Sequence, residues 1–320
     1  MKRSRQAAYA DSTHKVHKVQ WKTYIKFCLF YNFDLVPVSA ENLSLFAQFL
    51  ARSFVSPSTI KNYISGAKLL HIIMQVDTKA FETYEFKLTI KGITRRLKHM
   101  PRQASPITPA LLLQFRKFLD LNNPADASYW SLFLTAFFAM ARKSNLVPAS
   151  KNSFDPEKQL SRSRVLVGED CLLVIWSWAK NIQKGDRMHK MPLLSIRQSP
   201  LCPVLAYKNM CSLVKVGNNQ PAFSVPAGKG HVPITYSQFN RKLKHLVSLC
   251  GLNPDVFSTH SFRRGEATYT FQADVPETLI QLQGDWASDC YKRYLKMGMA
   301  EKKLVSLRMG NLITASLGHE

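Results

Sequence analysis

A polar, proline-containing break after residue 100 is the feature that most constrains the fold of this chain. The segment Pro101-Arg-Gln-Ala-Ser-Pro106 interrupts a pattern that is otherwise largely helical around it, and prolines among small polar residues are typical of a loop. A chain of 320 residues is long enough for a hydrophobic core on each side of such a loop. We therefore expect two domains, residues 1–100 and 108–320, joined by a linker at 101–107.

The first domain is expected to consist of four helices with basic faces. Apolar residues recur at helical spacing over residues 12–32, and Ser39 and Ser56-Pro57 are typical helix starts. A fourth helix is expected near 84–98. Basic residues lie between the apolar positions of these helices, and those expected to face a partner are Lys18, Lys22, Lys61, Lys68, Arg95 and Arg96.

The second domain is expected to be mainly helical. Thr108-Pro109 is typical of a helix start, so a helix is expected over 109–120. The next helix, over 128–142, is densely apolar and should be buried, with Arg142 at its end. Further helices are expected near residues 201–215, 235–250, 258–273, 276–283, 288–297 and 301–315. The last of them is apolar enough either to dock on a neighbouring copy or to pack within its own chain.

A small antiparallel sheet is expected among these helices. Runs rich in Val, Leu, Ile and Trp at 163–167 and 171–178 flank Gly168-Glu-Asp170 and predict a β-hairpin. Residues 188–194 could add a third strand, which would leave Lys180 in a turn at the sheet edge. The expected fold class is therefore mainly α, with a mixed α+β second domain.

The chain is strongly basic. Its 44 Lys and Arg residues against 21 Asp and Glu give a formal net charge of +23 and a pI of about 9.9. The excess is divided almost evenly, with +11 on residues 1–103 and +12 on the rest. This charge favours a polyanionic partner, and its distribution indicates that both domains contact that partner. A basic protein that is merely soluble stays an alternative, because charge says nothing about chemistry.

Cysteine usage and hydropathy indicate an intracellular protein. The six cysteines form no C-x-x-C pair and have no regular spacing, so free thiols in a reducing compartment are expected. No apolar run approaches the roughly 18 residues of a membrane span. The basic N-terminus has no apolar signal core behind it, and it hints at the nucleus if the source is eukaryotic. His14 and His17 lack nearby metal-binding partners, and no metal or cofactor is expected.

The last quarter of the chain contains an ordered set of chemically capable residues. His260-Ser-Phe-Arg263 is followed by a Gly-Asp-Trp286 triplet and then by Tyr291-Lys-Arg-Tyr294. Each of these motifs is weak evidence for function by itself. A His-x-x-Arg pair is often a solvated pair of side chains, and aromatic residues often belong to a hydrophobic core. Their order, spacing and basic context together point to chemistry on a phosphodiester.

These residue types can attack a phosphodiester without a metal ion. A phenol has a pKa of about 10, so a tyrosine nucleophile needs a base such as His260 and a cationic setting. Arg142 and Arg263 can neutralise the charge that builds on the non-bridging oxygens, although Arg142 could also merely cap its helix. Trp286 can exclude water and donate its indole N–H. Lys180 can protonate the departing 5′ oxygen.

The chain resembles the tyrosine recombinases of the phage-integrase family. The resemblance covers nearly the whole chain, and its motifs Ala141-Arg-Lys-Ser-Asn-Leu-Val-Pro148 and Gly284-Asp-Trp-Ala-Ser-Asp-Cys-Tyr-Lys-Arg-Tyr-Leu295 are similar to eukaryotic mobile-element recombinases of the Crypton and DIRS types, and less like the bacterial Xer proteins. It implies a four-helix, SAM-like DNA-binding domain followed by a catalytic domain. The catalytic residues that it implies are Arg142, Lys180, His260, Arg263, Trp286 and Tyr294, and Arg264 joins the residues expected to contact DNA.

The function that the resemblance implies is site-specific DNA recombination or integration. Such an enzyme would form a 3′-phosphotyrosyl intermediate on double-stranded DNA, exchange strands within a homotetramer and need no cofactor. Two alternatives stay open: a non-catalytic DNA-binding protein derived from a mobile element, and a topoisomerase IB-like enzyme that reseals the same strand. An RNA-binding module is disfavoured, because the sequence has no stacking-sheet signature.

The chain departs from the family pattern at two positions. The bacterial pattern usually has an acidic residue three positions after the first arginine, where this chain has Asn145, so a supporting carboxylate is missing or comes from elsewhere. Trp286 precedes the nucleophile position by one residue fewer than is common, which leaves Tyr291 as a second candidate. Tyr294 is preferred because it begins the sequence Tyr-Leu-Lys, and Leu-Lys resembles the residues after the family's nucleophile.

Overall fold

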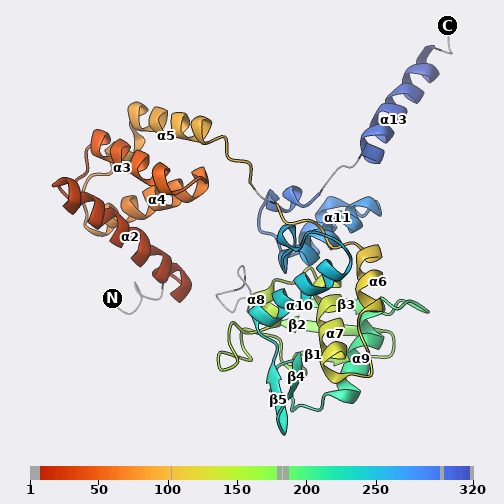
Figure 1. The fold of residues 1–320 in the computed structure, drawn as a ribbon. Helices are drawn as coiled ribbons and strands as arrows, with labels where there is room; N and C mark the ends of the chain where they lie inside the picture. Colours follow the sequence, from red (N-terminus) through yellow and green to blue (C-terminus); the bar gives the residue numbers. More distant parts are fainter. Residues whose placement is uncertain (1–7, 102, 179–181, 183–186, 296–298, 318–320) are drawn as a thin grey trace. The chain divides into compact units, whose positions relative to one another are not determined.

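The division of the chain into two units is the main feature of the fold (Figure 1). The computed structural model describes residues 8–101, 103–178, 182, 187–295 and 299–317. The two units comprise residues 1–102 and 103–320, and each unit has a buried hydrophobic cluster of its own. No helix in the described ranges is long and apolar enough to cross a membrane.

The first unit is helical, as the sequence predicts. Its described elements are α2 (Asp11–Tyr31), α3 (Ala40–Ser53), α4 (Pro57–Ile73), the 3-10 helix η1 (Lys79–Glu82) and α5 (Tyr84–Leu97). Ser39 and Thr83 begin α3 and α5, because each side chain accepts a hydrogen bond from a backbone N–H of the first turn. Aromatic rings fill the core: the ring centres of Tyr24 and Phe27 lie 5.1 Å and 5.0 Å from that of Phe46.

The second unit is mainly helical with small antiparallel sheets, which confirms the predicted fold class. Its described elements are α6 (Pro109–Lys117), α7 (Pro124–Phe138), α8 (Lys143–Leu146), η2 (Arg162–Arg164), β1 (Val165–Val167), β2 (Cys171–Trp176), β3 (His189–Leu194), α9 (Pro203–Leu213), β4 (Ser224–Ala227), β5 (Gly230–Pro233), α10 (Tyr236–Leu249), η3 (Pro254–Val256), α11 (His260–Gln272), α12 (Glu277–Gln283), η4 (Asp289–Arg293) and α13 (Met299–Leu317). The helix expected from residue 288 is therefore the short 3-10 helix η4. Docking of α13 on a neighbour or within its own chain stays a prediction.

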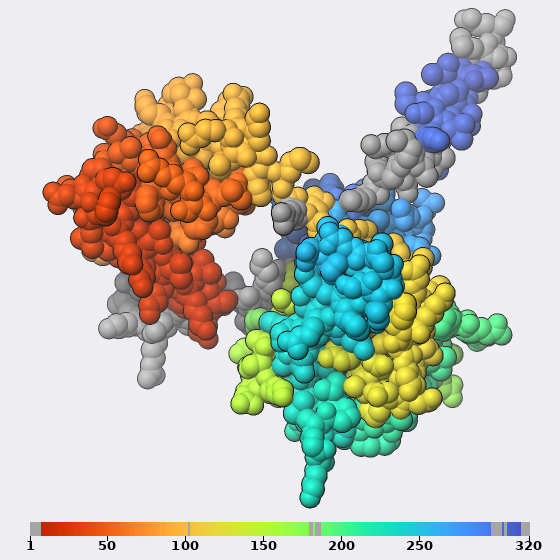
Figure 2. Space-filling view, viewed as in Figure 1, coloured from red at the N-terminus to blue at the C-terminus, as the bar shows by residue number. Residues whose placement is uncertain are grey.

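The expected three-stranded sheet is present, with the order β1-β2-β3 and antiparallel pairing throughout. Val165 pairs with Val174, and Trp176 pairs with His189. The expectation of one sheet is wrong, because β4 and β5 form a second hairpin whose tip stands out from the surface of the second unit (Figure 2). Prolines within these short strands hide them from sequence reading, since proline removes a backbone donor.

Helix α7 lies at the centre of the second unit's core and packs against α10 and α11. The ring of Phe133 on α7 lies 5.7 Å from Phe239 on α10 and 5.2 Å from Phe262 on α11, between ring centres. All three rings are buried. Arg263, the next residue on α11, is buried as well.

The central helix ends at Phe138, so the expectation that it continues to residue 142 is wrong. Met140 has a left-handed φ of 45°, and the chain turns there before α8 begins. Arg142 occupies the N-cap position of α8 and therefore does not lie in the last turn of α7. The turn depends on a tertiary contact, because the Met140 carbonyl accepts a hydrogen bond from Arg263.

Part of the expected linker is attached to the second unit. The N–H of Ser105 donates to the last carbonyl of η3 over 2.6 Å, and that of Ile107 donates to the Ser261 carbonyl over 3.0 Å. Gly265 allows this close approach, because a Cβ at that position would overlap the Ile107 carbonyl. Residues 103–107, which we call the strap, are therefore fixed to the first turns of α11.

Candidate active site

Tyr294 and His260 are in contact, although they come from separate elements. Tyr294 follows η4, and His260 is the first residue of α11. The Tyr294 hydroxyl lies 2.5 Å from His260 Nε2. The hydroxyl of Thr268, further along α11, donates to the Tyr294 carbonyl over 2.6 Å. Tyr294 is thus held beside α11 by both its side chain and its backbone.

Arg263 lies one turn beyond His260 and is only 3% exposed. Its two terminal nitrogens donate to the backbone carbonyls of Met140 and Gly284, which follow the ends of α7 and α12. Its guanidinium carbon lies 4.0 Å from the centre of the Trp286 ring. A planar guanidinium held by two carbonyls and an aromatic face is fixed in orientation.

Trp286 lies beside the guanidinium of Arg263 and beside both tyrosines. Its ring centre lies 5.6 Å from that of Tyr294 and 6.0 Å from that of Tyr291, and the residue is buried. Gly284 is required two residues earlier, because a Cβ there would overlap the Trp286 ring. The Gly-Asp-Trp triplet is therefore a packing motif in which the indole ring of Trp286 lies against the backbone of Gly284.

Arg142 and Arg263 line the same small cavity. The cavity has a volume of about 20 Å³, and Asn145 and His189 also contribute to it, so it has room for about one water-sized group. On its other side, Arg142 borders an open groove that is also lined by His260 and by residues of α10. The structure thus brings Arg142, Arg263 and His260 to neighbouring parts of one surface.

Desolvation and nearby positive charge favour the neutral form of His260. Desolvation lowers the pKa of His260, and the charges of Arg263 and Arg142 lower it further. Burial, followed by the charge of Arg142, lowers the pKa of Arg263 to about 9, while Tyr294 and Glu266 act in the opposite direction. At neutral pH the imidazole can therefore accept a proton from Tyr294 while Arg263 stays cationic.

Tyr291, the second candidate for the nucleophile, lies in a different environment. It is 4% exposed, and its hydroxyl donates to the Glu277 carboxylate over 3.2 Å. Burial raises the pKa of Tyr291, and the contact with Glu277 raises it further, which makes its phenolate harder to form. The hydroxyl of Tyr294 contacts His260, whereas that of Tyr291 contacts Glu277.

Lys180 lies outside the described residues. The described residues just before it are tied to α8, because Asn145 Nδ2 donates to the Trp178 carbonyl over 2.8 Å. The Trp176 indole N–H donates to the Asn145 carbonyl over 3.3 Å. Asn145 therefore connects the helix that follows Arg142 to the end of β2, through neutral hydrogen bonds rather than through a carboxylate.

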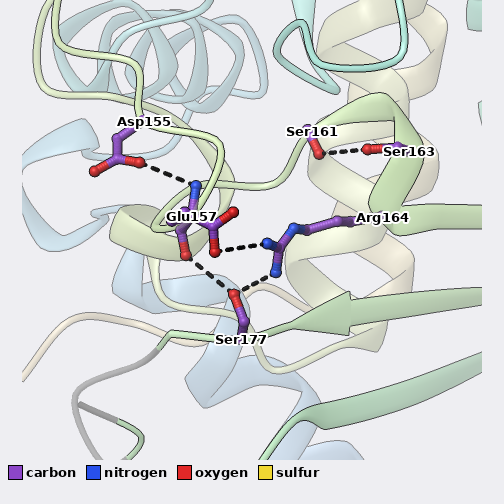
Figure 3. Close-up of polar contacts among 6 residues, drawn as sticks. All are labelled: Asp155, Glu157, Ser161, Ser163, Arg164 and Ser177. Atoms are coloured by element: carbon purple, nitrogen blue, oxygen red, sulfur yellow. Dashed lines mark hydrogen bonds and ion pairs between the residues drawn. The ribbon is translucent and has the colours of Figure 1, made fainter. Parts of the chain in front are cut away.

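A polar cluster also fixes the end of β2 (Figure 3). Arg164, at the end of η2, pairs with the Glu157 carboxylate over 2.9 Å and donates to the Ser177 hydroxyl. Ser177 donates in turn to the Glu157 carbonyl over 3.2 Å, and Asp155 accepts from the Glu157 N–H over 3.0 Å. The cluster links the loop before β1 to the residue that follows β2.

Sequence reading missed several polar residues near Arg263. Asp285 forms an ion pair with Arg187, and the His189 ring stacks on Trp176 at 5.8 Å between ring centres. Glu266 lies three residues after Arg263 on α11, a spacing that could have pointed to it. Within the described ranges, no group of three His, Cys, Asp or Glu side chains could hold a metal ion.

The basic residues expected to contact DNA differ in exposure. Lys68 forms an ion pair with Glu82 over 2.5 Å. Arg264 contradicts the expectation, because it is 4% exposed and donates to Gln103 Oε1 over 2.5 Å and to the Arg293 carbonyl over 3.4 Å. It fixes the strap instead of facing a partner. Of the residues on the first unit that were expected to contact DNA, the exposed ones are Lys18, Lys22, Lys61, Arg95 and Arg96.

Comparisons with known proteins agree on the fold. No protein-family profile matches the chain. The integrase/recombinase XerD homolog of Selenomonas ruminantium is 22% identical over 326 residues, which cover 97% of this chain and 89% of the relative. The XerH site-specific recombinase bound to its difH substrate aligns with a TM-score of 0.60 and 16% identity, over 89% of this chain and 75% of that chain.

Two further solved structures align with this chain. The Tn1549 transposon integrase in complex with circular intermediate DNA aligns with a TM-score of 0.60 and 14% identity, over 96% of both chains. The lambda integrase dimer bound to a core site aligns with a TM-score of 0.58 and 14% identity, over 92% of both chains. The chain therefore has the fold that these recombinases and integrases share.

Proposed function

We propose that this protein is a site-specific DNA recombinase or integrase that cleaves DNA with Tyr294. The observation that carries the proposal is the 2.5 Å contact between the Tyr294 hydroxyl and His260 Nε2, beside a cavity lined by two arginines. The fold supports it, because XerH, the Tn1549 integrase and lambda integrase share that fold and are each bound to DNA. The net charge of +23 suits a partner whose backbone is anionic.

In the proposed reaction the Tyr294 oxygen attacks the phosphorus while its proton passes to His260. A 3′-phosphotyrosyl bond forms, and the bond from phosphorus to the 5′ oxygen breaks. Lys180 is proposed to give that oxygen its proton. The charge on the non-bridging oxygens is stabilised by Arg142 and Arg263. A guanidinium has five N–H donors, so the two hydrogen bonds to carbonyls leave Arg263 with donors for the phosphate.

The proposal extends to the outcome on DNA. The released 5′ hydroxyl attacks the phosphotyrosyl bond of a partner strand, which restores the phosphodiester and frees Tyr294. Such an exchange needs two duplexes and two cleavages on each, which a homotetramer on double-stranded DNA provides. Trp286 excludes water from the guanidinium side of the site, and this protects the phosphotyrosyl bond from hydrolysis. A Crypton- or DIRS-like element and a nuclear location are part of the proposal.

Capture of covalent adducts tests the chemistry. A library of nicked duplexes with random sequence would be incubated with the protein, denatured and searched for DNA that stays attached. Tyr294→Phe should abolish the adduct, Tyr291→Phe should keep it, and excess chelator should leave it unchanged. DNA binding without any adduct would favour the non-catalytic alternative, and supercoil relaxation without strand exchange would favour the topoisomerase-like one.

A further inference from the structure

Glu266 is a buried carboxylate that the proposed reaction does not use. It lies on α11 one turn after Arg263 and is 6% exposed. Carboxylates are seldom buried unless a partner compensates for their lost hydration. Burial raises the pKa of Glu266 well above its usual value, so its surroundings do not fully provide that compensation.

The contacts of Glu266 join the ends of two helices. Its Oε1 accepts a hydrogen bond from Gln283 Nε2 over 2.9 Å, and the same nitrogen donates to the Phe138 carbonyl over 3.3 Å. Gln283 is the last residue of α12, and Phe138 is the last residue of α7. Against the effect of burial, the charge of Arg263 and the contact with Gln283 lower the pKa of the carboxyl. Glu266 therefore lies where α7, α11 and α12 meet.

The same two helix ends hold Arg263. The carbonyl of Met140 follows α7 by two residues, the carbonyl of Gly284 follows α12 by one, and both accept from the terminal nitrogens of Arg263. A guanidinium is a rigid planar fork, so it can bond both carbonyls only if the separation of the two helix ends is fixed. Glu266 and Gln283 bridge the helices at that junction.

In its ionised form, Glu266 also places negative charge beside Arg263. Arg142 is a like charge that lowers the pKa of Arg263, and Glu266 raises it. Asn145, which replaces the acidic residue of the bacterial pattern, is neutral. The second oxygen of Glu266 has no hydrogen-bond partner among the described residues, so its interaction with the nearby guanidinium is electrostatic.

We propose that Glu266 is a positioning residue that holds Arg263 toward the scissile phosphate, by setting the separation of the Met140 and Gly284 carbonyls and by opposing the charge of Arg142. It supplies from α11 the carboxylate that Asn145 lacks. The phosphate part of this inference rests on the proposed function, whereas the hold on Arg263 does not. The two parts are therefore tested by separate measurements.

The hold on Arg263 can be measured without DNA. In protein labelled with ¹⁵N-arginine, the Arg263 guanidinium is assigned by its absence in Arg263→Lys, and its rotation is followed by NMR. Rotation should be slow in the wild-type protein and at least about tenfold faster in Glu266→Gln, which keeps the shape but exchanges one acceptor oxygen for an NH₂ group. Glu277→Gln, a change of a carboxylate outside this junction, should leave it slow. Unchanged rotation in Glu266→Gln overturns the proposal.

The link to chemistry is measured as single-turnover adduct formation on a duplex recovered by adduct capture. Glu266→Gln should slow it by about tenfold, the lower end of the range for loss of a supporting contact at metal sites. DNA affinity should stay within about twofold, and the melting temperature should stay equal or rise because the substitution removes an ionisable group whose burial is only partly compensated. Gln283→Leu should act in the same direction and replaces Glu266→Gln if the latter does not fold.

A double-mutant cycle separates positioning from a general loss of structure. In an Arg263→Lys background, Glu266→Gln should cause no further loss of rate, because its effect passes through Arg263. Losses that multiply, or a wild-type rate for Glu266→Gln alone, overturn the proposal. If the wild-type protein forms no adduct with any duplex, the proposed function fails, and the rotation measurement still decides whether Glu266 positions Arg263.

Discussion

His260 lies between a phenol and two guanidinium groups, and this setting fixes the direction of its titration. Its pKa is lowered by desolvation first and then by Arg263 and Arg142, whereas in the unfolded chain it has the ordinary value of about 6.5. Between the two values the unfolded chain binds more protons, so stability rises with pH. The contribution of His260 is therefore complete above about pH 6.5 and is lost as the pH falls below it.

The rate of adduct formation should follow the same titration. Because neutral His260 is the proposed base, the rate should stay level from about pH 8 to pH 6.5 and fall only under more acidic conditions. His260→Gln should lower the rate by at least about 10²-fold and remove the acidic decline. Single-turnover rates across the pH range, with DNA occupancy held constant, check this. A decline that is already present between pH 8 and pH 7 would contradict a neutral base.

Arg263→Lys should show that geometry matters beyond charge. A lysine has a single cationic nitrogen, which cannot bond two carbonyls and a phosphate as the forked guanidinium does. Adduct formation should fall by at least about 10²-fold, the scale for loss of one donor to a developing charge, with little change in DNA affinity. Arg264→Lys is the matched control and should retain most of the rate. Parallel losses of rate and affinity in Arg263→Lys would make it a DNA-binding residue only.

At the scale of elements, the site is built from helix ends rather than helix faces. The first turns of α11 supply His260 and Arg263, the turn after α7 supplies the Met140 carbonyl, and the turn after α12 supplies Gly284 and Trp286. Such junctions depend on several elements at once. A displacement at any of them should disturb the guanidinium of Arg263, even when the helices themselves stay folded.

Gly284→Ala tests this dependence on a turn. A Cβ at 284 would overlap the Trp286 ring, so the indole must move, at a cost of about 1–3 kcal/mol in the free energy of unfolding. Gly92→Ala in α5 is the control with the opposite sign, because a Cβ there meets no atom within 4 Å and alanine favours a helix by about 1 kcal/mol. Urea unfolding measures both, and a Gly284→Ala protein as stable as wild type would contradict the packing.

The helices and the ordering of the site residues could be predicted from the sequence because they follow from local periodicity and spacing. The end of α7 could not, because Met140 adopts its left-handed turn in contact with Arg263, which is 123 residues away. The β4–β5 hairpin was hidden by its prolines, as at Pro226 and Pro233. Glu266 was missed because a single carboxylate in a helix ordinarily faces solvent, and only packing shows that this one does not.

At the scale of the whole molecule, the two units carry nearly equal net charge, +11 and +12, and each has a hydrophobic core of its own. DNA affinity should therefore depend on their covalent connection, because tethering makes the second contact intramolecular. The strap belongs to the second unit, so a fragment for that unit should begin at residue 103 and not at 108.

Each separated unit should bind duplex DNA weakly, and the intact chain should bind much more tightly. The logarithm of affinity should fall with the logarithm of salt concentration by about 0.9 for each phosphate neutralised, with a steeper slope for the intact chain than for either part. Fluorescence anisotropy at several salt concentrations measures this. If the fragment 103–320 binds as tightly as the whole with the same slope, the first unit does not bind DNA.

The hydrogen bonds of the strap determine where tension in the chain between the units would act. Its last hydrogen bond joins Ile107 to Ser261, and Ser261 is the neighbour of His260. Tension in the chain between the units therefore meets the contacts of the strap with Arg264 and η3 first, and the first turn of α11 after them. If the first unit binds DNA as predicted, a pull on the chain would act beside the pair formed by His260 and Tyr294.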